Sequence, residues 1–138
     1  MAIDGLKYNG LTEKIIGAAM KVHQILGNGF QEVIYQRALM IEFRKLDLSF
    51  SREQEMNIFY EGIHIGTRRV DFLIDKIIVV ELKALLALED IHLAQTINYL
   101  EAYNLEVGLL INFGARSLEF KRLRNKKFKP NPTQNNAS

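Results

Sequence analysis

The chain has 138 residues, a hydrophobic share of 48%, a charged share of 25% and no cysteine. These values fit one globular domain with a single core, and they exclude disulfide scaffolds, thiol nucleophiles and thiolate metal sites. No apolar run approaches the about 18 residues of a membrane span, and the N-terminus MAIDGLKYNG lacks the features of a signal peptide, so we expect a cytoplasmic protein without membrane contact.

Charge is distributed unevenly along the chain, although the net charge is only +2. From Arg116 onward, seven Lys or Arg side chains stand against Glu119 alone, so this segment carries +6 and residues 1–115 carry −4. A clustered basic segment is typical of proteins that bind polyanions. The alternative is a solvated tail that keeps the protein soluble.

The first part of the chain predicts two helices followed by strands. Apolar residues recur at spacings of three and four over residues 11–26 and again over 30–46. Over residues 48–74 they alternate, which predicts antiparallel strands with one turn at 61–62 and another near Gly66.

The second part predicts a buried strand, a helix and two further strands. The β-branched run IIVV at 77–80 leads into Glu81, residues 89–103 return to helical spacing, and 106–113 and 118–123 have the character of strands. The order α-α-β-β-β-β-α-β-β predicts an α/β domain, with helices flanking a mixed sheet, over residues 1–128. Residues 129–138 are polar and contain two prolines, and we expect them to form a disordered tail.

Two carboxylates and a lysine make RVDFLIDKIIVVELKA the most informative segment. Asp71 lies ten residues before Glu81, so a hairpin that turns at 75–77 would place both carboxylates opposite each other on one face of the sheet. Like charges in that arrangement destabilise a hairpin unless a cation compensates them. Lys83 would supply part of this positive charge, and Mg²⁺ or Mn²⁺ would supply the rest, with the Leu82 carbonyl as a further ligand. The alternative is a solvated Glu–Lys pair at a strand end.

This segment resembles the D-(x)n-ExK core of the PD-(D/E)xK nuclease superfamily, although Val70 stands where the name of the motif has proline. The run GNGFQEVIYQRAL resembles the signature of the small GxxExxY proteins through Gly29, Glu32 and Tyr35. A third segment, AQTINYL, resembles the QxxxY element that follows ExK in the RecB-like branch of the superfamily.

The resemblance implies a restriction-endonuclease-like fold and a set of active-site residues, which are Glu32, Asp71, Glu81, Lys83, Gln95 and Tyr99. In this family Glu32 would reach the metal directly or through water, and Gln95 and Tyr99 would border the active site and the DNA. Other interpretations stay open. Glu32 suits the N-terminus of a helix because the macrodipole favours a negative charge there, and Tyr99 suits the core with Gln95 at its margin.

These observations predict a metal-dependent nuclease that hydrolyses phosphodiester bonds of nucleic acid, with DNA expected rather than RNA. Glu32, Asp71, Glu81 and the Leu82 carbonyl would hold Mg²⁺ or Mn²⁺, and Lys83 would orient the attacking water. The expected phosphate contacts are basic side chains of two segments, namely Arg68, Arg69, Lys121, Arg122 and Arg124.

Several alternatives accompany this prediction. Arg69 would otherwise pair with Glu81 or with another carboxylate. A nucleic-acid-binding module without turnover and an interaction protein without a nucleic-acid partner are the competing classes. A homodimer is a further expectation, because a domain this small often cuts duplex DNA only as a pair of subunits.

Overall fold

The computed structural model describes residues 7–130, which form three helices and one five-stranded mixed sheet. Helices α1 (Asn9–Leu26) and α2 (Glu32–Lys45) come first, and strands β1 (Phe50–Tyr60), β2 (Ile63–Ile74) and β3 (Ile78–Lys83) follow. The chain then forms α3 (Asp90–Tyr103), β4 (Val107–Asn112) and β5 (Glu119–Arg124). The strands lie in the order β1-β2-β3-β4-β5, where β3 and β4 are parallel and the other neighbours are antiparallel.

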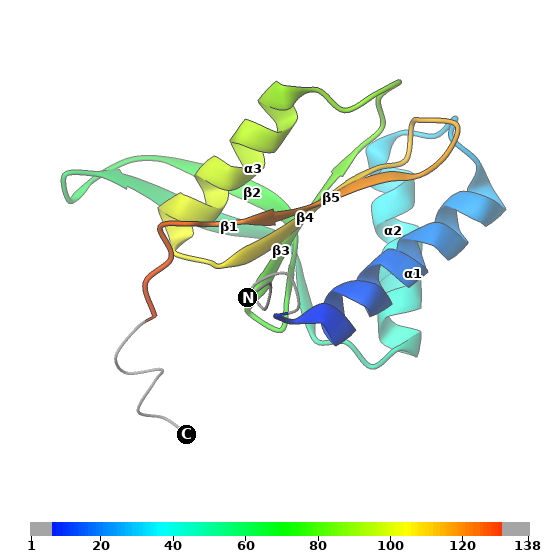
Figure 1. Ribbon diagram of the computed structural model, residues 1–138, viewed down its shortest axis with the longest axis horizontal. Helices are drawn as coiled ribbons and strands as arrows, with labels where there is room; N and C mark the ends of the chain where they lie inside the picture. The colour runs from blue at the N-terminus through cyan, green and yellow to red at the C-terminus, as the bar shows by residue number, and fades with distance from the viewer. Residues whose placement is uncertain (1–6, 131–138) are drawn as a thin grey trace.

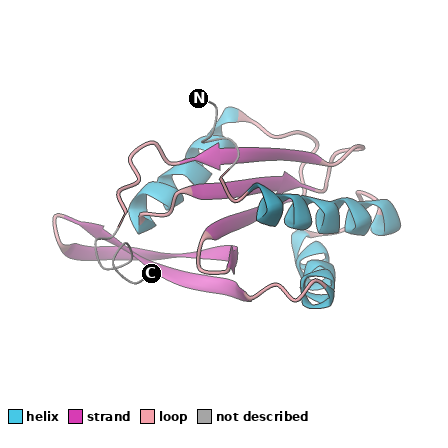
Figure 2. Cartoon of the chain, turned by 60° about the horizontal axis from the view of Figure 1, so that its bottom comes forward, coloured by secondary structure: helices cyan, strands magenta, loops and turns pink. Residues whose placement is uncertain are grey.

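Helices cover both faces of the sheet, α1 and α2 on one side and α3 on the other (Figure 1, Figure 2). Strand β3 is buried on both faces, as its β-branched run predicts. Ile78 and Val80 pack with the apolar stripes of α1 and α2, whereas Val79 packs with α3. The predicted class, a mixed α/β domain, is therefore confirmed.

The number of strands before α3 is three, not the predicted four. The turn at Glu61 and Gly62 is present, and both residues have positive φ (49° and 80°), as a tight hairpin turn requires. The prediction of a second turn near Gly66 was wrong. Gly66 pairs with Ile58 inside a continuous β2, next to an irregularity at which Ile65 has no partner on β1. A glycine inside a strand can mark such a bulge instead of a turn.

The β1–β2 hairpin extends beyond the rest of the sheet as a two-stranded arm (Figure 1). β1 pairs with β2 over nearly its whole length, while β3 pairs with β2 only over residues 72–74. The arm therefore leaves the sheet close to Asp71, so it carries the first segment of the predicted active site at its base.

None of the helices within residues 7–130 is long and apolar enough to cross a membrane. At the start of the predicted tail, Lys129 is tied to the end of α3: its N–H donates to Asn104 Oδ1 over 3.0 Å, and its carbonyl accepts from Asn104 Nδ2 over 2.7 Å. Residues 131–138 of that tail lie outside the described residues.

Candidate active site

The β2–β3 hairpin pairs regularly near its turn and splits at Asp71. Residues 75–77 close the hairpin, and regular pairing ends at Phe72 opposite Val80. At the next position, hydrogen bonds from the backbone to the Asp71 and Glu81 carboxylates take the place of backbone–backbone pairing. We call these two residues the acidic pair. The Asp71 N–H donates to Glu81 Oε1 over 2.9 Å, and the Leu82 N–H donates to Asp71 Oδ2 over 2.8 Å. The acidic side chains thus join the two strands where backbone pairing stops.

The backbone around Asp71 is irregular on its other side as well. Pairing between β1 and β2 skips the position opposite Asp71, where Glu53 has a left-handed φ of 52°. Val70 packs on the α3 side of the sheet and Phe72 on the α1–α2 side, although residues two apart on a regular strand share one face. The two carboxylates therefore meet at a break in the strand, and not through the simple alternation that the sequence predicts.

Gln36 of α2 holds Asp71 from the helical side. Its Nε2 donates to Asp71 Oδ1 over 3.0 Å, and the side chain is 4% exposed. Gln36 lies one helical turn after Glu32 and so shares its face of α2. The sequence reasoning missed Gln36, although its spacing of four from Glu32 was a usable signal.

Glu81 faces a cation and two aromatic side chains on the α3 side. The carboxylate is 3.6 Å from Arg68 Nη2 through Oε2, and the Arg68 guanidinium lies over the Tyr99 ring, 4.8 Å from its centroid. Tyr103 lies one turn beyond Tyr99, and its hydroxyl donates to the Met56 carbonyl over 3.2 Å. Tyr99 thus reaches the acidic pair through Arg68.

Gln95 lies one turn before Tyr99 on the same face of α3 and is half-buried. It takes no part in the hydrogen bonds of Asp71 and Glu81 given above.

Burial and mutual repulsion make the carboxylates weaker acids than usual. Burial, followed by the charge of Asp71, raises the pKa of Glu81 to about 7. Burial also raises the pKa of Asp71, and partial burial together with the charge of Asp71 raises the pKa of Glu32. The charges of Arg68 and Lys83 act on all three groups and lower each pKa in part. The structure therefore brings Glu32 and Lys83 within electrostatic reach of the acidic pair.

The loop that follows Lys83 is fixed by buried hydrogen bonds. The Lys83 carbonyl accepts from the Phe113 N–H over 2.8 Å, and Lys83 pairs with Asn112 in the parallel ladder. Asn112 is fully buried, and its amide exchanges two hydrogen bonds of 2.9 Å with the backbone N–H and C=O of Leu85. The sequence reasoning missed Asn112, because its partner lies on another element.

The donor set suits a hard divalent cation, because carboxylates that repel each other in a buried site gain from a cation between them. Asp71 and Glu81 are the neighbouring carboxylates here, because the Glu81 carboxylate accepts the backbone N–H of Asp71 and the Asp71 carboxylate accepts that of Leu82. Within residues 7–130, no three His, Cys, Asp or Glu side chains are gathered closely enough to hold an ion together. The chemistry of the pair fits a metal, and Glu32 contributes charge from a greater distance.

Comparison with known proteins shows what this arrangement belongs to. Residues 9–123 match the family model described as the PD-(D/E)XK nuclease superfamily. The chain belongs to this superfamily. Among solved structures, the crystal structure of SSO0001 matches 94% of this chain with 19% identity and a TM-score of 0.52, which supports the fold. This chain spans 63% of the length of that protein. No curated protein matches the chain significantly.

Tyr35 has a structural role in this protein, in the loop between α1 and α2. Its hydroxyl donates to the Gly27 carbonyl over 2.6 Å and accepts from the Phe30 N–H over 3.1 Å, and its ring stacks on Phe113 with centroids 4.5 Å apart. These contacts fix the loop that leads into Glu32. Gly29 in the same loop has open space around it, since an added Cβ would meet nothing within 4 Å.

The predicted phosphate-binding side chains fall into two groups. Arg68 and Arg69 lie on β2. Arg69 pairs with Glu55 over 3.8 Å, and the side chains of Arg69 and Glu55 are largely exposed. Lys121 of β5 lies in the same cross-strand row as Glu81, through Leu110.

The other two basic side chains lie nearer the opposite end of the sheet. Arg122 and Arg124 are in the rows of Val80 and Ile78, toward the turn of the β2–β3 hairpin. Arg122 also donates to the Lys7 carbonyl through Nη2. Of these three side chains, Lys121 is therefore the one that shares the row of Glu81.

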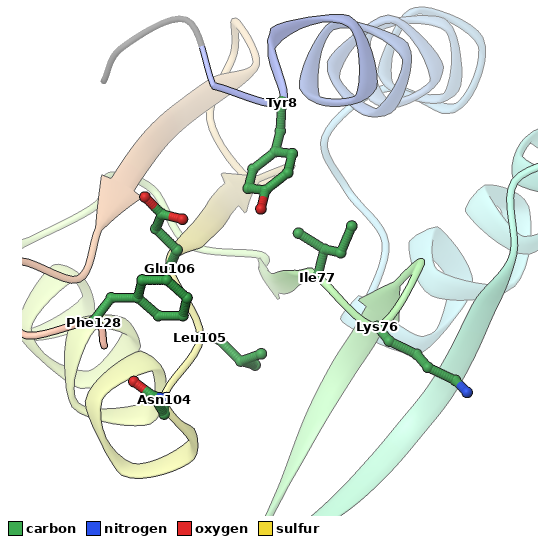
Figure 3. Close-up of a pocket in the computed structure, with 7 residues that line it drawn as sticks. All are labelled: Tyr8, Lys76, Ile77, Asn104, Leu105, Glu106 and Phe128. Carbon is green, nitrogen blue, oxygen red and sulfur yellow. The ribbon is translucent and has the colours of Figure 1, made fainter. Parts of the chain in front are cut away.

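A small cavity of about 80 Å³ lies at that far end of the sheet (Figure 3). Its lining comes from the hairpin turn, the loop after α3 and both ends of the described chain, with Tyr8, Lys76, Ile77, Asn104, Leu105, Glu106 and Phe128. Glu106 pairs with Lys7 over 2.7 Å. Glu106 is the one carboxylate among the lining residues, so this cavity lacks the two neighbouring carboxylates of the site at Asp71 and Glu81.

Proposed function

We propose that this protein is a nuclease that hydrolyses phosphodiester bonds of nucleic acid, DNA rather than RNA, with Mg²⁺ or Mn²⁺ at Asp71 and Glu81. The observation that carries the proposal is the split hairpin, in which the buried Glu81 carboxylate and the half-buried Asp71 carboxylate each accept a backbone N–H of the opposite strand. Membership of the superfamily supports the same chemistry.

Asp71 and Glu81 would hold the cation, with Glu32 and the Leu82 carbonyl completing its surroundings. Such a cation, when bound, supplies Lewis-acid polarisation of the scissile phosphate and lowers the pKa of water. Gln36 keeps the Asp71 carboxylate oriented through its 3.0 Å hydrogen bond. Asp71 also accepts from the Leu82 N–H, so the protein sets its direction from two sides.

Lys83 would orient the attacking water and stabilise the charge that develops on the phosphate oxygens in the transition state. The hydrogen bonds between Asn112 and Leu85 support this role, because they fix the loop after Lys83 before any substrate binds. Gln95 would position Lys83 or a substrate phosphate, and Tyr99 would contact the nucleic acid. Arg68, Arg69 and Lys121 are the proposed phosphate contacts, and Arg122 and Arg124 would extend them.

The finer assignment to the GxxExxY proteins and the RecB-like branch remains a proposal. It is supported by Glu32 at the start of α2 and by the loop contacts of Tyr35 just behind it. We also propose that duplex cleavage uses two copies of the chain, because one domain offers one acidic pair. A cleavage rate that rises more steeply than linearly with protein concentration would support this.

The function is tested by incubating the protein with single-stranded DNA, duplex DNA and RNA in Mg²⁺, in Mn²⁺ and in a chelator. We expect the wild type to cleave DNA only with a metal. Lys83→Ala should lower the cleavage rate by about 100-fold or more, because it removes charge that stabilises the transition state.

Lys14→Ala is the matched control, since Lys14 is exposed on α1, and it should cleave like the wild type. A wild type that shifts DNA on a gel but cleaves no nucleic acid with either metal would instead be a binding module on the nuclease fold.

A further inference from the structure

Arg68 lies beside the carboxylate that the proposed function assigns to a metal. Its Nη2 is 3.6 Å from Glu81 Oε2, while the other oxygen of Glu81 is engaged by the Asp71 N–H. The guanidinium is held from the other side by the Tyr99 ring, 4.8 Å away. Arg68 therefore supplies positive charge at Glu81 Oε2, which we call the outer oxygen of Glu81.

The contact between Arg68 and Glu81 leaves part of the guanidinium unsatisfied. The distance of 3.6 Å is longer than a good charge-assisted hydrogen bond, and Arg68 Nε is buried without a hydrogen-bond partner within residues 7–130. A guanidinium presents its donors as a planar fork that matches a phosphate group, and its side chain here is 40% exposed. A backbone phosphate of nucleic acid would satisfy donors that Glu81 leaves free.

A guanidinium and a divalent cation repel each other at one carboxylate. While Arg68 holds the outer oxygen of Glu81, a cation must displace it or bind beside another positive charge. A phosphate that draws Arg68 away would free this oxygen and would add negative charge near the cation. Nucleic acid and cation would then each favour binding of the other.

We propose that Arg68 is a positioning residue that exchanges Glu81 for a substrate phosphate, and that this exchange couples nucleic-acid binding to divalent-cation binding. The inference rests on the proposed function, because it takes Glu81 as a cation ligand. Coupling between two ligands is reciprocal, so the factor by which DNA raises cation affinity equals the factor by which the cation raises DNA affinity. The protein would hold its cation weakly until a substrate is present.

The test measures Mn²⁺ binding by calorimetry and electron paramagnetic resonance, with and without a short phosphorothioate DNA that resists hydrolysis. For the wild type we expect this DNA to raise Mn²⁺ affinity about fivefold or more. Arg68→Gln should bind Mn²⁺ more tightly than the wild type when DNA is absent, and DNA should no longer change its affinity.

Arg44→Gln is the matched control. Arg44 also lies over an aromatic ring, that of Phe50 at 5.6 Å, but on the last turn of α2 and away from Glu81. The Arg44→Gln substitution removes the same charge as Arg68→Gln, and it should keep the wild-type coupling between DNA and Mn²⁺ binding. Circular dichroism establishes that each variant is folded, so a change in coupling reports on Arg68 and not on unfolding.

The outcomes separate the inference from the proposed function. Equal Mn²⁺ affinities with and without DNA in the wild type, or full coupling in Arg68→Gln, overturn the role of Arg68 even if the protein cleaves DNA. Coupling without any cleavage supports the role of Arg68 and overturns the nuclease proposal. Mn²⁺ binding that Glu81→Gln leaves unchanged overturns both.

Discussion

Glu81 is a buried carboxylate that the fold keeps in contact with a second acidic residue. It is 3% exposed, and its surroundings favour its protonated form because burial and Asp71 both disfavour a negative charge there. Arg68 offsets this cost in part. The cost itself is a physical reason to expect a functional role, since strongly perturbed carboxylates gather at active sites.

The pKa of Glu81 predicts how stability depends on pH. Its pKa is raised from 4.5 to about 7 in the folded protein, so between these values the native state binds more protons than the unfolded chain. The contribution of Glu81 to the free energy of unfolding therefore falls as pH rises from 4.5 to about 7. In a chelating buffer at pH 8, Glu81→Gln should be more stable than the wild type by about 1–3 kcal/mol, and this gain should disappear near pH 4.

Urea denaturation at the two pH values measures this difference. Glu55→Gln serves as the control, because Glu55 is an exposed carboxylate on the arm, 60% accessible and paired with Arg69. Its effect should be small and similar at both pH values. A gain for Glu81→Gln that is the same at pH 4 and pH 8 would contradict the raised pKa.

Sequence alone located the residues whose charge conflicts with their surroundings. Asp71 and Glu81 stand out because a buried β-branched strand has no ordinary reason to end in a carboxylate opposite another. Gln36 and Asn112 do not stand out in this way, since a neutral amide fits a helix or a strand end equally well. Their roles follow from contacts with Asp71 and Leu85, which are 35 and 27 residues away in the chain.

At the scale of elements, the loops after β3 and β4 cross closely at Gly114. A Cβ added there would lie 2.3 Å from the Leu85 backbone nitrogen and 2.5 Å from the Ala84 carbonyl carbon. Backbone atoms cannot move aside as a flexible side chain does. The close approach of Gly114 to Ala84 and Leu85 holds the segment that follows Lys83. The position of Lys83 therefore depends on the absence of a side chain at Gly114.

Gly114→Ala should therefore separate the two loops. We expect it to destabilise the protein by about 2–3 kcal/mol, because the added methyl group forces backbone shifts and weakens the hydrogen bonds of Asn112. If the loop positions Lys83, DNA cleavage should fall by more than the loss of folded protein explains. Urea denaturation and cleavage assays on the same samples measure the two effects.

Gly17→Ala provides the opposite expectation. Gly17 lies within α1, where an added Cβ meets nothing within 4 Å. Alanine in a helix should raise stability by about 0.5–1 kcal/mol. If both substitutions had the same small effect, the close crossing at Gly114 would not exist in solution.

The elements also show where sequence patterns mislead. Both Gly62 and Gly66 were interpreted as turns, because glycine next to alternating apolar residues is a common turn signal. Only Gly62 has a positive φ and closes the hairpin. Gly66 lies inside β2, next to the irregularity in its pairing with β1, so there the glycine accompanies a bulge within a strand and not a turn.

At the scale of the whole molecule, the acidic pair joins the two halves of the structure. Asp71 connects to α2 through Gln36, and Glu81 connects to the α3 side through Arg68 and Tyr99. A change of charge at the pair therefore acts on both layers that cover the sheet. The fold class could be inferred from periodicity, but this connection could not, because it depends on the break in β2 at Asp71.

This central position predicts that a bound cation stabilises the entire fold. A ligand that binds the native state and not the unfolded chain adds about 2.7 kcal/mol at 100 times its dissociation constant, which for a chain of this size raises the melting temperature by roughly 8–10 °C. At pH 8, where Glu81 is ionised, saturating Mn²⁺ should produce such a rise in the wild type. Glu81→Gln should lose most of it, while Glu55→Gln should keep it. Equal rises in the two variants would place the stabilising ion elsewhere, whereas a loss confined to Glu81→Gln would tie the stability of the native state to the same carboxylates that the nuclease proposal requires.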